Sequence, residues 1–188
     1  MTLLLETNRL IMRPFQAKDI QAFANYRSES AVAKYQSWDT PFSLEKATQF
    51  INEMKAVHPG TPGEWYQVAI ELKEEGLLIG DCAFHIFVEE PRQAEFGVTL
   101  SGKYQGKGYA REAVTRLLNH LFTDFRLHRI QATCDAENIA SSKLLESIGM
   151  RREAYFVENI WFKGSWGSEY MYGLLRQEWE NNASVLSF

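Results

Sequence analysis

The segment between Ala94 and Cys134 constrains the fold of this chain more than any other part of its sequence. Residues 94–100 have the composition of a strand, and a loop with two glycines follows them. Residues 110–125 then place apolar side chains at helical spacing, and residues 127–134 alternate between apolar and polar side chains. A strand, a helix and a second strand in this order form a βαβ unit, so the sequence predicts two neighbouring parallel strands.

The segments on either side of this unit predict a sheet that is otherwise mostly antiparallel. Short connections join three successive strands, and two later strands form a hairpin across residues 164–167. Asp19, Ser43 and Asn138 are each placed to cap the start of a helix. The predicted strands are 10–15, 66–72, 77–87, 94–100, 127–134, 152–163 and 168–175, and the predicted helices are 19–28, 43–54, 110–125 and 138–148.

The whole pattern predicts one domain over residues 1–188, with a core at about residues 6–180. We expect the α+β (mixed α/β) class, with a central, mixed, mostly antiparallel sheet of about six to seven strands. About four helices should flank this sheet, and one parallel pair should interrupt its antiparallel order.

The composition excludes several kinds of protein. Hydrophobic residues make up 45% of the 188 residues and charged residues 23%, which is typical of globular proteins. The formal net charge is −4 and no run of Lys or Arg occurs, so we expect no nucleic-acid partner. The two cysteines, Cys82 and Cys134, are far apart, and we expect no metal site. Residues 1–6 lack a basic leader and no stretch is apolar enough to span a bilayer, so we expect a cytoplasmic protein without a membrane partner.

The loop over residues 104–110, Tyr-Gln-Gly-Lys-Gly-Tyr-Ala, lies just before the helix of the βαβ unit. Gly106 and Gly108 can adopt positive φ and allow a ligand to approach the backbone closely. Successive N–H groups at the start of a helix, together with the helix dipole, form a site for an anion. The loop therefore predicts phosphate binding, although a plain glycine-rich turn has the same composition.

Three phosphate-binding motifs compete for this loop. A Walker loop needs a different glycine spacing and a Ser or Thr after its Lys, and this chain has neither. A Rossmann fingerprint needs a small residue where Arg111 stands, and it does not follow three antiparallel strands. The Gln-x-x-Gly-x-Ala pattern of acyl-CoA enzymes is met by Gln105, Gly108 and Ala110. A nucleotide-dependent oxidoreductase thus stays a weaker alternative.

Four ordered blocks of sequence carry a resemblance to a known family. They are residues 6–14, residues 94–98 with 105–113, residues 138–150 and residues 169–179. In these blocks the chain resembles the GNAT superfamily of N-acetyltransferases. More narrowly, it is similar to the RimJ/RimL-like branch, which includes ribosomal-protein N-terminal acetyltransferases and related spermidine and antibiotic acetyltransferases.

The resemblance implies acetyl-CoA as cosubstrate, bound where two parallel strands splay apart. It implies that the pantetheine arm pairs with the backbone of the strand before the loop, that the loop N–H groups hold the pyrophosphate, and that two residues of the next motif lie near the thioester. The cofactor-binding residues implied in this way are Phe96, Val98, Leu100, Gln105, Gly106, Lys107, Gly108, Tyr109, Ala110, Asn138 and Ser141.

The implied chemistry is direct attack of an amine on the thioester in a ternary complex. The N–H of Val98 would polarise the carbonyl as an oxyanion donor. Glu95 matches an acidic position of the family and would act as the base, with His85 as a weaker alternative. No covalent intermediate is required, so we expect that Cys134 is not a nucleophile.

The resemblance identifies the general acid less directly than it identifies the base. Many relatives have a tyrosine seven residues after the motif asparagine, where this chain has Leu145. Ser141 is the substitute that the resemblance suggests, as a hydrogen-bond donor to the sulfur. The catalytic set that we expect is therefore Glu95, Ser141 and Val98.

The resemblance implies that the acceptor is a primary amine, either a protein N-terminal α-amine or a small molecule such as a polyamine or aminoglycoside. The loop after the first helix and the final hairpin should form its site, with Tyr35, Trp38, Tyr155 and Trp161 as candidates. For any one of these aromatic residues, packing in the core or in a dimer is the more common explanation, and both a monomer and a homodimer fit the sequence. A non-catalytic acyl-CoA-binding regulator on the same fold is a further alternative.

Overall fold

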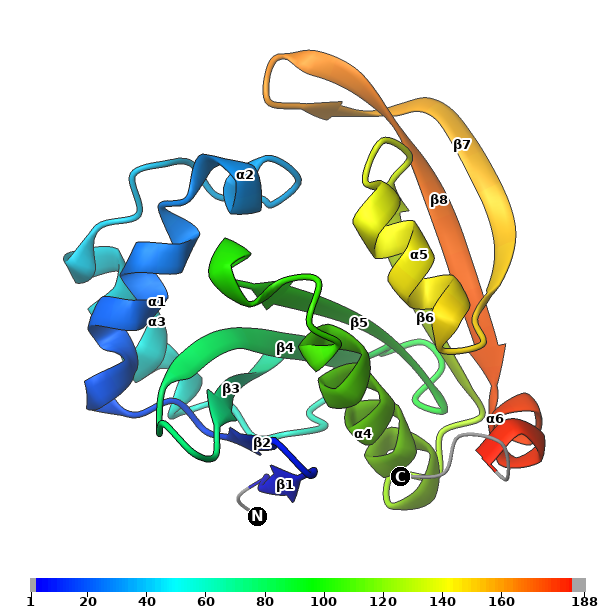
Figure 1. Ribbon diagram of the computed structural model, residues 1–188. Coiled ribbons are helices and arrows are strands. Elements are labelled where there is room, and N and C mark those ends of the chain that lie inside the picture. The colour runs from blue at the N-terminus through cyan, green and yellow to red at the C-terminus, as the bar shows by residue number, and fades with distance from the viewer. Residues whose placement is uncertain (1–2, 184–188) are drawn as a thin grey trace.

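The computed structural model describes residues 3–183 and contains one eight-stranded sheet with the order β1-β2-β3-β4-β5-β6-β8-β7. All neighbouring strands are antiparallel except β5 and β6, which are parallel. The predicted βαβ unit is therefore confirmed (Figure 1). The strands are β1 (Leu5–Glu6), β2 (Leu10–Arg13), β3 (Tyr66–Leu72), β4 (Leu78–Ile86), β5 (Gln93–Leu100), β6 (Arg129–Asp135), β7 (Arg151–Phe162) and β8 (Ser165–Leu175).

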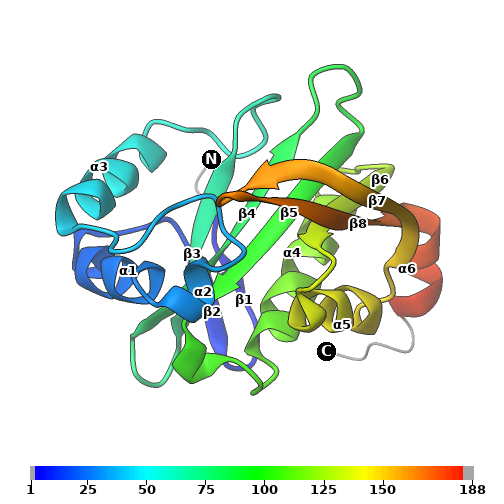
Figure 2. The ribbon, with the colours of Figure 1, turned by 90° about the horizontal axis from the view of Figure 1, so that it is seen from above.

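The helices form a layer on each side of this sheet (Figures 1 and 2). Two short 3-10 helices, η1 (Ala17–Asp19) and η2 (Gly102–Tyr104), accompany them. The described residues form more strands and α-helices than we expected, because short elements such as β1 leave little periodic pattern in the sequence. The α-helices are α1 (Ile20–Arg27), α2 (Ser30–Ala33), α3 (Leu44–Met54), α4 (Tyr109–Thr123), α5 (Ile139–Ser147) and α6 (Arg176–Ala183).

Alternate residues of the central strands are buried against the two helix layers. On β3, Val68 and Ile70 pack in the larger core with α4, whereas Ala69 packs in a second core with α1 and α3. Because successive strand residues point to opposite faces, this alternation sorts the side chains of the whole sheet. One face meets α4 and α5, and the other face meets α1 and α3 only over β3 and β4.

The final hairpin turns earlier than we expected. Lys163 and Gly164 form a two-residue turn in which both residues have positive φ, 48° and 88°. Two-residue turns of this kind match the right-handed twist of the strands that they join. Trp166 and Gly167, which we placed in the turn, belong to β8 instead.

Two of the three predicted helix caps are confirmed. Ser43 accepts a hydrogen bond from Lys46 N at 3.1 Å, and Asn138 accepts one from Ser141 N at 3.1 Å. The side chain of Asp19 does not cap α1, although α1 does begin at the next residue.

The carboxylate of Asp19 is engaged elsewhere. It accepts two hydrogen bonds from the Arg13 guanidinium, at 2.7 and 2.9 Å, and one from Gln16 N at 2.7 Å. Arg13 also bonds to Glu71 on β3, and all three charged residues are buried. The preference of aspartate for a helix start is therefore overridden by a buried ion pair that joins β2 to η1.

Candidate active site

The parallel strands β5 and β6 pair over only three positions. Gln93 pairs with Arg129, Ala94 with Ile130, and Glu95 with Gln131, and within the described strands no further position pairs. Both strands nevertheless continue, β5 to Leu100 and β6 to Asp135. A wedge therefore opens between them beyond Glu95. The wedge lies at the predicted parallel pair, which is where the resemblance implied that two strands splay apart.

The hydrogen bonds between β4 and β5 determine which backbone groups of β5 point into this wedge. Phe87 N donates to Gln93 O at 3.1 Å, and Ser101 N donates to Ile79 O at 2.9 Å. These bonds, and the unbroken register between them, direct the backbone N–H and C=O groups of the odd-numbered residues of β5 toward β4. The N–H and C=O groups of the even-numbered residues therefore point toward β6.

Phe96, Val98 and Leu100 are the even-numbered residues of β5 beyond the last paired position. The Glu95–Gln131 pair engages the Phe96 N–H, so within the described strands the groups that face the wedge without a partner on β6 are the Phe96 carbonyl and the backbone groups of Val98 and Leu100. The Leu100 carbonyl accepts one hydrogen bond, from Gln105 Nε2 at 2.9 Å. The side chain of Gln105 thus closes the following loop against β5, while the remaining groups could pair with an extended ligand.

The glycine loop lies at the mouth of the wedge. Gly106 and Gly108 have φ of 73° and 82°, and Gly108 is the N-cap of α4. The first hydrogen bond of α4 runs from Glu112 N to Gly108 O at 3.0 Å, so the N–H groups of residues 109–111 have no partner within the helix. These N–H groups and the helix dipole can hold an anion such as a phosphate.

Arg9 holds this loop from outside. Its Nη1 donates to Lys107 O at 3.1 Å, and its guanidinium lies 4.3 Å from the centre of the Tyr109 ring. Its Nε and the Thr7 hydroxyl both donate to the carboxylate of Glu112, at 2.7 and 2.6 Å. We name Thr7, Arg9 and Glu112 the loop clamp. Sequence reasoning noted these three residues only as members of matched blocks and did not predict their contact.

The pKa of Glu112 reflects this clamp. Its partial burial alone would raise the pKa of the carboxyl group, but hydrogen bonds from Thr7 and from the Arg9 backbone and guanidinium outweigh it and lower the pKa. Glu112 therefore stays ionised at neutral pH, as its partners require.

The opposite side of the wedge carries the start of α5. The Asn138 side chain is engaged as the helix cap, and Ser141 follows it in the first turn. Cys134 Sγ lies 3.6 Å from Ser142 Oγ, and burial raises the pKa of the Cys134 thiol. A neutral thiol is a poor nucleophile, which supports the expectation that Cys134 does not attack the thioester. Leu145, where relatives have a tyrosine, is buried in the larger core.

Glu95 occupies the last paired position before the wedge opens, and its side chain is 24% exposed. His85 lies opposite to it on β4. Two residues further along β5, a Cβ atom built on Gly97 would have no neighbour within 4 Å. The sheet face that carries Glu95 is therefore open next to the wedge.

The four predicted acceptor residues do not come together as one cluster. Tyr35 donates to Glu137 O at 3.3 Å, which places it beside the start of α5. Trp38 is engaged in packing, since its Nε1 donates to Arg27 O at 2.9 Å and its ring stacks on the Arg27 guanidinium. Tyr155 and Trp161 lie on the edge strand β7 and are 54% and 60% exposed.

A lysine joins the final hairpin to the segment after α1. Lys163 Nζ donates to Ala33 O at 2.7 Å and to Trp38 O at 2.8 Å. Figure 2 shows the tip of the β7–β8 hairpin above α2 and the loop that follows it. We name this connection the Lys163 bridge; sequence reasoning gave no indication of it.

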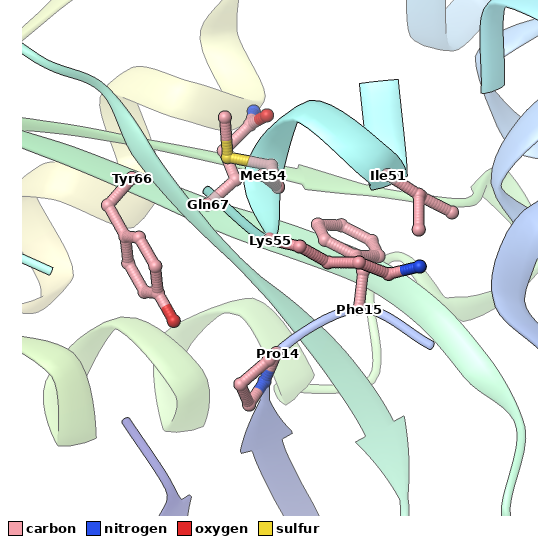
Figure 3. A pocket seen from close by; sticks show the side chains of 7 residues that line it. All are labelled: Pro14, Phe15, Ile51, Met54, Lys55, Tyr66 and Gln67. Atoms are coloured by element: carbon pink, nitrogen blue, oxygen red, sulfur yellow. The ribbon is translucent and has the colours of Figure 1, made fainter. Parts of the chain in front are cut away.

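The pocket between α3 and the start of β3 is too small to be a second candidate site. A cavity of about 20 Å³ between α3 and the start of β3 has room for a water molecule but not for a substrate. Figure 3 shows the residues that line it, Pro14, Phe15, Ile51, Met54, Lys55, Tyr66 and Gln67.

Among residues 3–183, no group of three or more His, Cys, Asp or Glu side chains is placed to hold a metal ion. In the same part of the chain, none of the helices has the length and apolar composition that a bilayer crossing requires.

An open sheet with a single parallel pair, splayed in front of a glycine-rich helix start, defines an acyltransferase of the GNAT type. Comparison with known proteins agrees: residues 9–151 match the family profile described as acetyltransferase (GNAT) domain. The chain belongs to this family and is an N-acetyltransferase.

Three similar proteins illustrate its place in the family. The uncharacterized N-acetyltransferase YnaD of Bacillus subtilis (strain 168) is 40% identical over 173 residues, which cover 92% of this chain and 97% of YnaD. The [ribosomal protein uS5]-alanine N-acetyltransferase of Escherichia coli (strain K12) is 25% identical over 183 residues, covering 93% and 92%. The crystal structure of a GNAT-family acetyltransferase from Bacillus anthracis superposes with a TM-score of 0.82 at 36% identity, covering 93% and 99%.

Proposed function

We propose that this N-acetyltransferase transfers an acetyl group from acetyl-CoA to a primary amine by direct attack in a ternary complex. The observation that carries the proposal is the wedge between β5 and β6. It presents the Phe96 carbonyl, both backbone groups of Val98 and the Leu100 N–H in line with the N–H groups of the glycine loop. An extended ligand with amide groups and a pyrophosphate fits this order of donors and acceptors.

The donor would lie in the wedge with its pyrophosphate on the N–H groups of residues 106–110, because the Gln105 N–H, which the sequence also suggested, donates to Gly102 O at 3.2 Å. Gly106 and Gly108 leave the backbone accessible there, and a Cβ atom built on Gly106 would have no neighbour within 4 Å. The thioester would then approach Glu95, with Asn138 and Ser141 on the α5 side. Val98 N–H is our candidate for the oxyanion donor.

The chemical step is balanced without a covalent enzyme intermediate. Glu95 takes a proton from the ammonium group of the acceptor, directly or through a water molecule. The amine nitrogen forms a bond to the carbonyl carbon, and the bond from that carbon to sulfur breaks. The CoA thiolate leaves and takes up, directly or through water, the second proton that the nitrogen loses as the amide forms, while a hydrogen bond from Ser141 stabilises the sulfur.

The charge of the open sheet face supports a cationic acceptor. The strand register places Glu95, Asp135 and Glu169 on the same face of β5, β6 and β8. Carboxylates on this face attract an ammonium group and repel anionic competitors. The name of the Escherichia coli relative, an alanine N-acetyltransferase of ribosomal protein uS5, favours a protein N-terminal α-amine within this class. A polyamine or an aminoglycoside is the second candidate, because the same carboxylates suit both.

An amine panel with a free-thiol readout tests the proposal. It contains peptides with free N-termini, the same peptides with blocked N-termini, polyamines and aminoglycosides. Thiol release with free but not with blocked peptides is the expected result. Release only with small polycations would redirect the acceptor assignment. Binding of acetyl-CoA without release for any amine would support the non-catalytic regulator, and absence of binding would contradict the cofactor site.

A further inference from the structure

His85 and Glu95 face each other across β4 and β5 at the point where the wedge begins. They are register partners, and His85 Nε2 lies 3.7 Å from Glu95 Oε2. Glu95 is also the last residue of β5 that pairs with β6. The histidine therefore lies next to the one carboxylate that the proposed reaction requires as a base.

The imidazole ring of His85 is fixed by packing. The Trp65 ring lies 4.3 Å from it and the Phe87 ring 4.9 Å, measured between ring centres. The His85 side chain is 16% exposed, so most of its surface is covered. A ring held on two sides by aromatic side chains keeps one orientation, and this orientation directs Nε2 at Glu95.

The other ring nitrogen determines the tautomer. Nδ1 of His85 is buried and has no hydrogen-bond partner among the described residues. A proton on Nδ1 would bury an unpaired donor there and would turn the lone pair of Nε2 toward a carboxylate. A proton on Nε2 avoids both, since it gives the carboxylate of Glu95 a donor. The arrangement therefore favours the tautomer with its proton on Nε2.

We infer that His85 is a positioning residue for the base Glu95, an inference that rests on the proposed acetyl transfer. A small rotation of the flexible Glu95 side chain brings Oε2 from 3.7 Å into hydrogen-bond range of Nε2. This bond holds Oε2 and directs Oε1 at the acceptor amine. His85 itself neither touches the substrate nor takes its proton.

Kinetics of three variants test this role. Glutamine can place its amide nitrogen near the position of Nε2, whereas leucine removes the donor and keeps a similar apolar volume. We expect His85→Leu to lower kcat about tenfold or more, because the base loses its alignment. His85→Gln should recover most of this loss, and the Kd of acetyl-CoA should be unchanged in both variants. His128→Leu, at an exposed histidine, is the matched control and should behave as wild type.

A spectroscopic measurement tests the tautomer independently of activity. Two-dimensional ¹⁵N–¹H correlation of the imidazole rings should show His85 protonated on Nε2 and bare on Nδ1. The opposite tautomer would overturn the inference, as would wild-type kcat in His85→Leu or an equal loss in His85→Gln. A wild-type protein that transfers acetyl to no amine would instead overturn the proposed function, which separates the two failures.

Discussion

The carboxylate of Glu112 holds Arg9 at two points, accepting from its backbone N–H at 2.9 Å and from its Nε at 2.7 Å. These residues are 103 positions apart in the sequence. Their contact ties the turn between β1 and β2 to the first turn of α4. Arg9 also binds Lys107 O, so the same residue holds the glycine loop.

Loss of the loop clamp should weaken both the fold and cofactor binding. Arg9→Ala removes the side-chain bonds to Glu112 and Lys107 but keeps the backbone bond, and we expect a loss of about 1 kcal/mol in unfolding free energy. The loop then loses its fixed shape, so the Kd of acetyl-CoA should rise in calorimetry. Arg92→Ala, which removes another exposed arginine with a carboxylate partner, is the control. Equal acetyl-CoA binding by both variants would refute the role of the clamp.

Gly108 and Gly76 provide a matched pair for testing the anion site. Both have positive φ, 82° and 64°, and Gly76 lies in the turn between β3 and β4. Valine at either position should lower stability by about 1–2 kcal/mol, because a left-handed backbone strains its side chain. Only Gly108→Val should abolish acetyl-CoA binding in calorimetry, because its Cβ would lie 3.4 Å from Arg9 Nη2 and the strained loop would no longer present its N–H groups to the pyrophosphate. Retained binding would sink our placement of the donor.

The Lys163 bridge should affect the acceptor and not the donor. Lys163→Met removes two hydrogen bonds to the segment after α1, and the hairpin tip loses its attachment. We expect the KM of the amine to rise, by up to about thirtyfold for two bonds of about 1 kcal/mol each. The Kd of acetyl-CoA should stay the same. Lys55→Met, at a lysine that bonds only locally to Asn52, is the comparison, and a parallel change in both variants would argue against the bridge.

Glu153 should contribute to the acid stability of the protein. The Arg129 guanidinium, assisted by Arg151, lowers its pKa from 4.5 to about 2, against the effect of partial burial. A carboxyl group whose pKa is lowered by folding stabilises the protein above its unfolded pKa, and this contribution is lost as the pH falls toward 2.

Urea denaturation measures this contribution. Between about pH 5 and about pH 2.5, the unfolding free energy of the wild type should fall by about 1 kcal/mol more than that of Glu153→Gln. Glu45→Gln, at an exposed residue of α3, should keep the wild-type pH dependence. An identical pH dependence of Glu153→Gln and wild type would contradict the assigned ion pair.

Local patterns in the sequence were sufficient for the architecture near the wedge. Alternating side chains, the two glycines and the caps at Ser43 and Asn138 act within a few residues, so the sequence displays them directly. The same reasoning failed at Asp19, because the buried Arg13 competes for its carboxylate. It also misplaced the turn of the hairpin, because the positive φ of Lys163 has no signal in the sequence and because a glycine such as Gly167 is typical of a turn.

The contacts that shape the candidate site are mostly long-range. The clamp joins residues more than 100 positions apart, and the Lys163 bridge spans 130 positions to Ala33. The pairing of His85 with Glu95 depends on a register between two strands, which neither residue reveals alone. Such contacts follow from the packed fold, and only the resemblance to a family drew attention to some of their members.

The short ladder between β5 and β6 has a consequence for how occupancy of the site can be observed. The N–H groups of Val98 and Leu100 face the wedge, so the fold itself gives them no strand partner there. Their protection from solvent exchange would come from a ligand and not from global stability. These two amide protons are thus built-in reporters: deuterium uptake at them follows the filling of the wedge, while their odd-numbered neighbours report on the sheet.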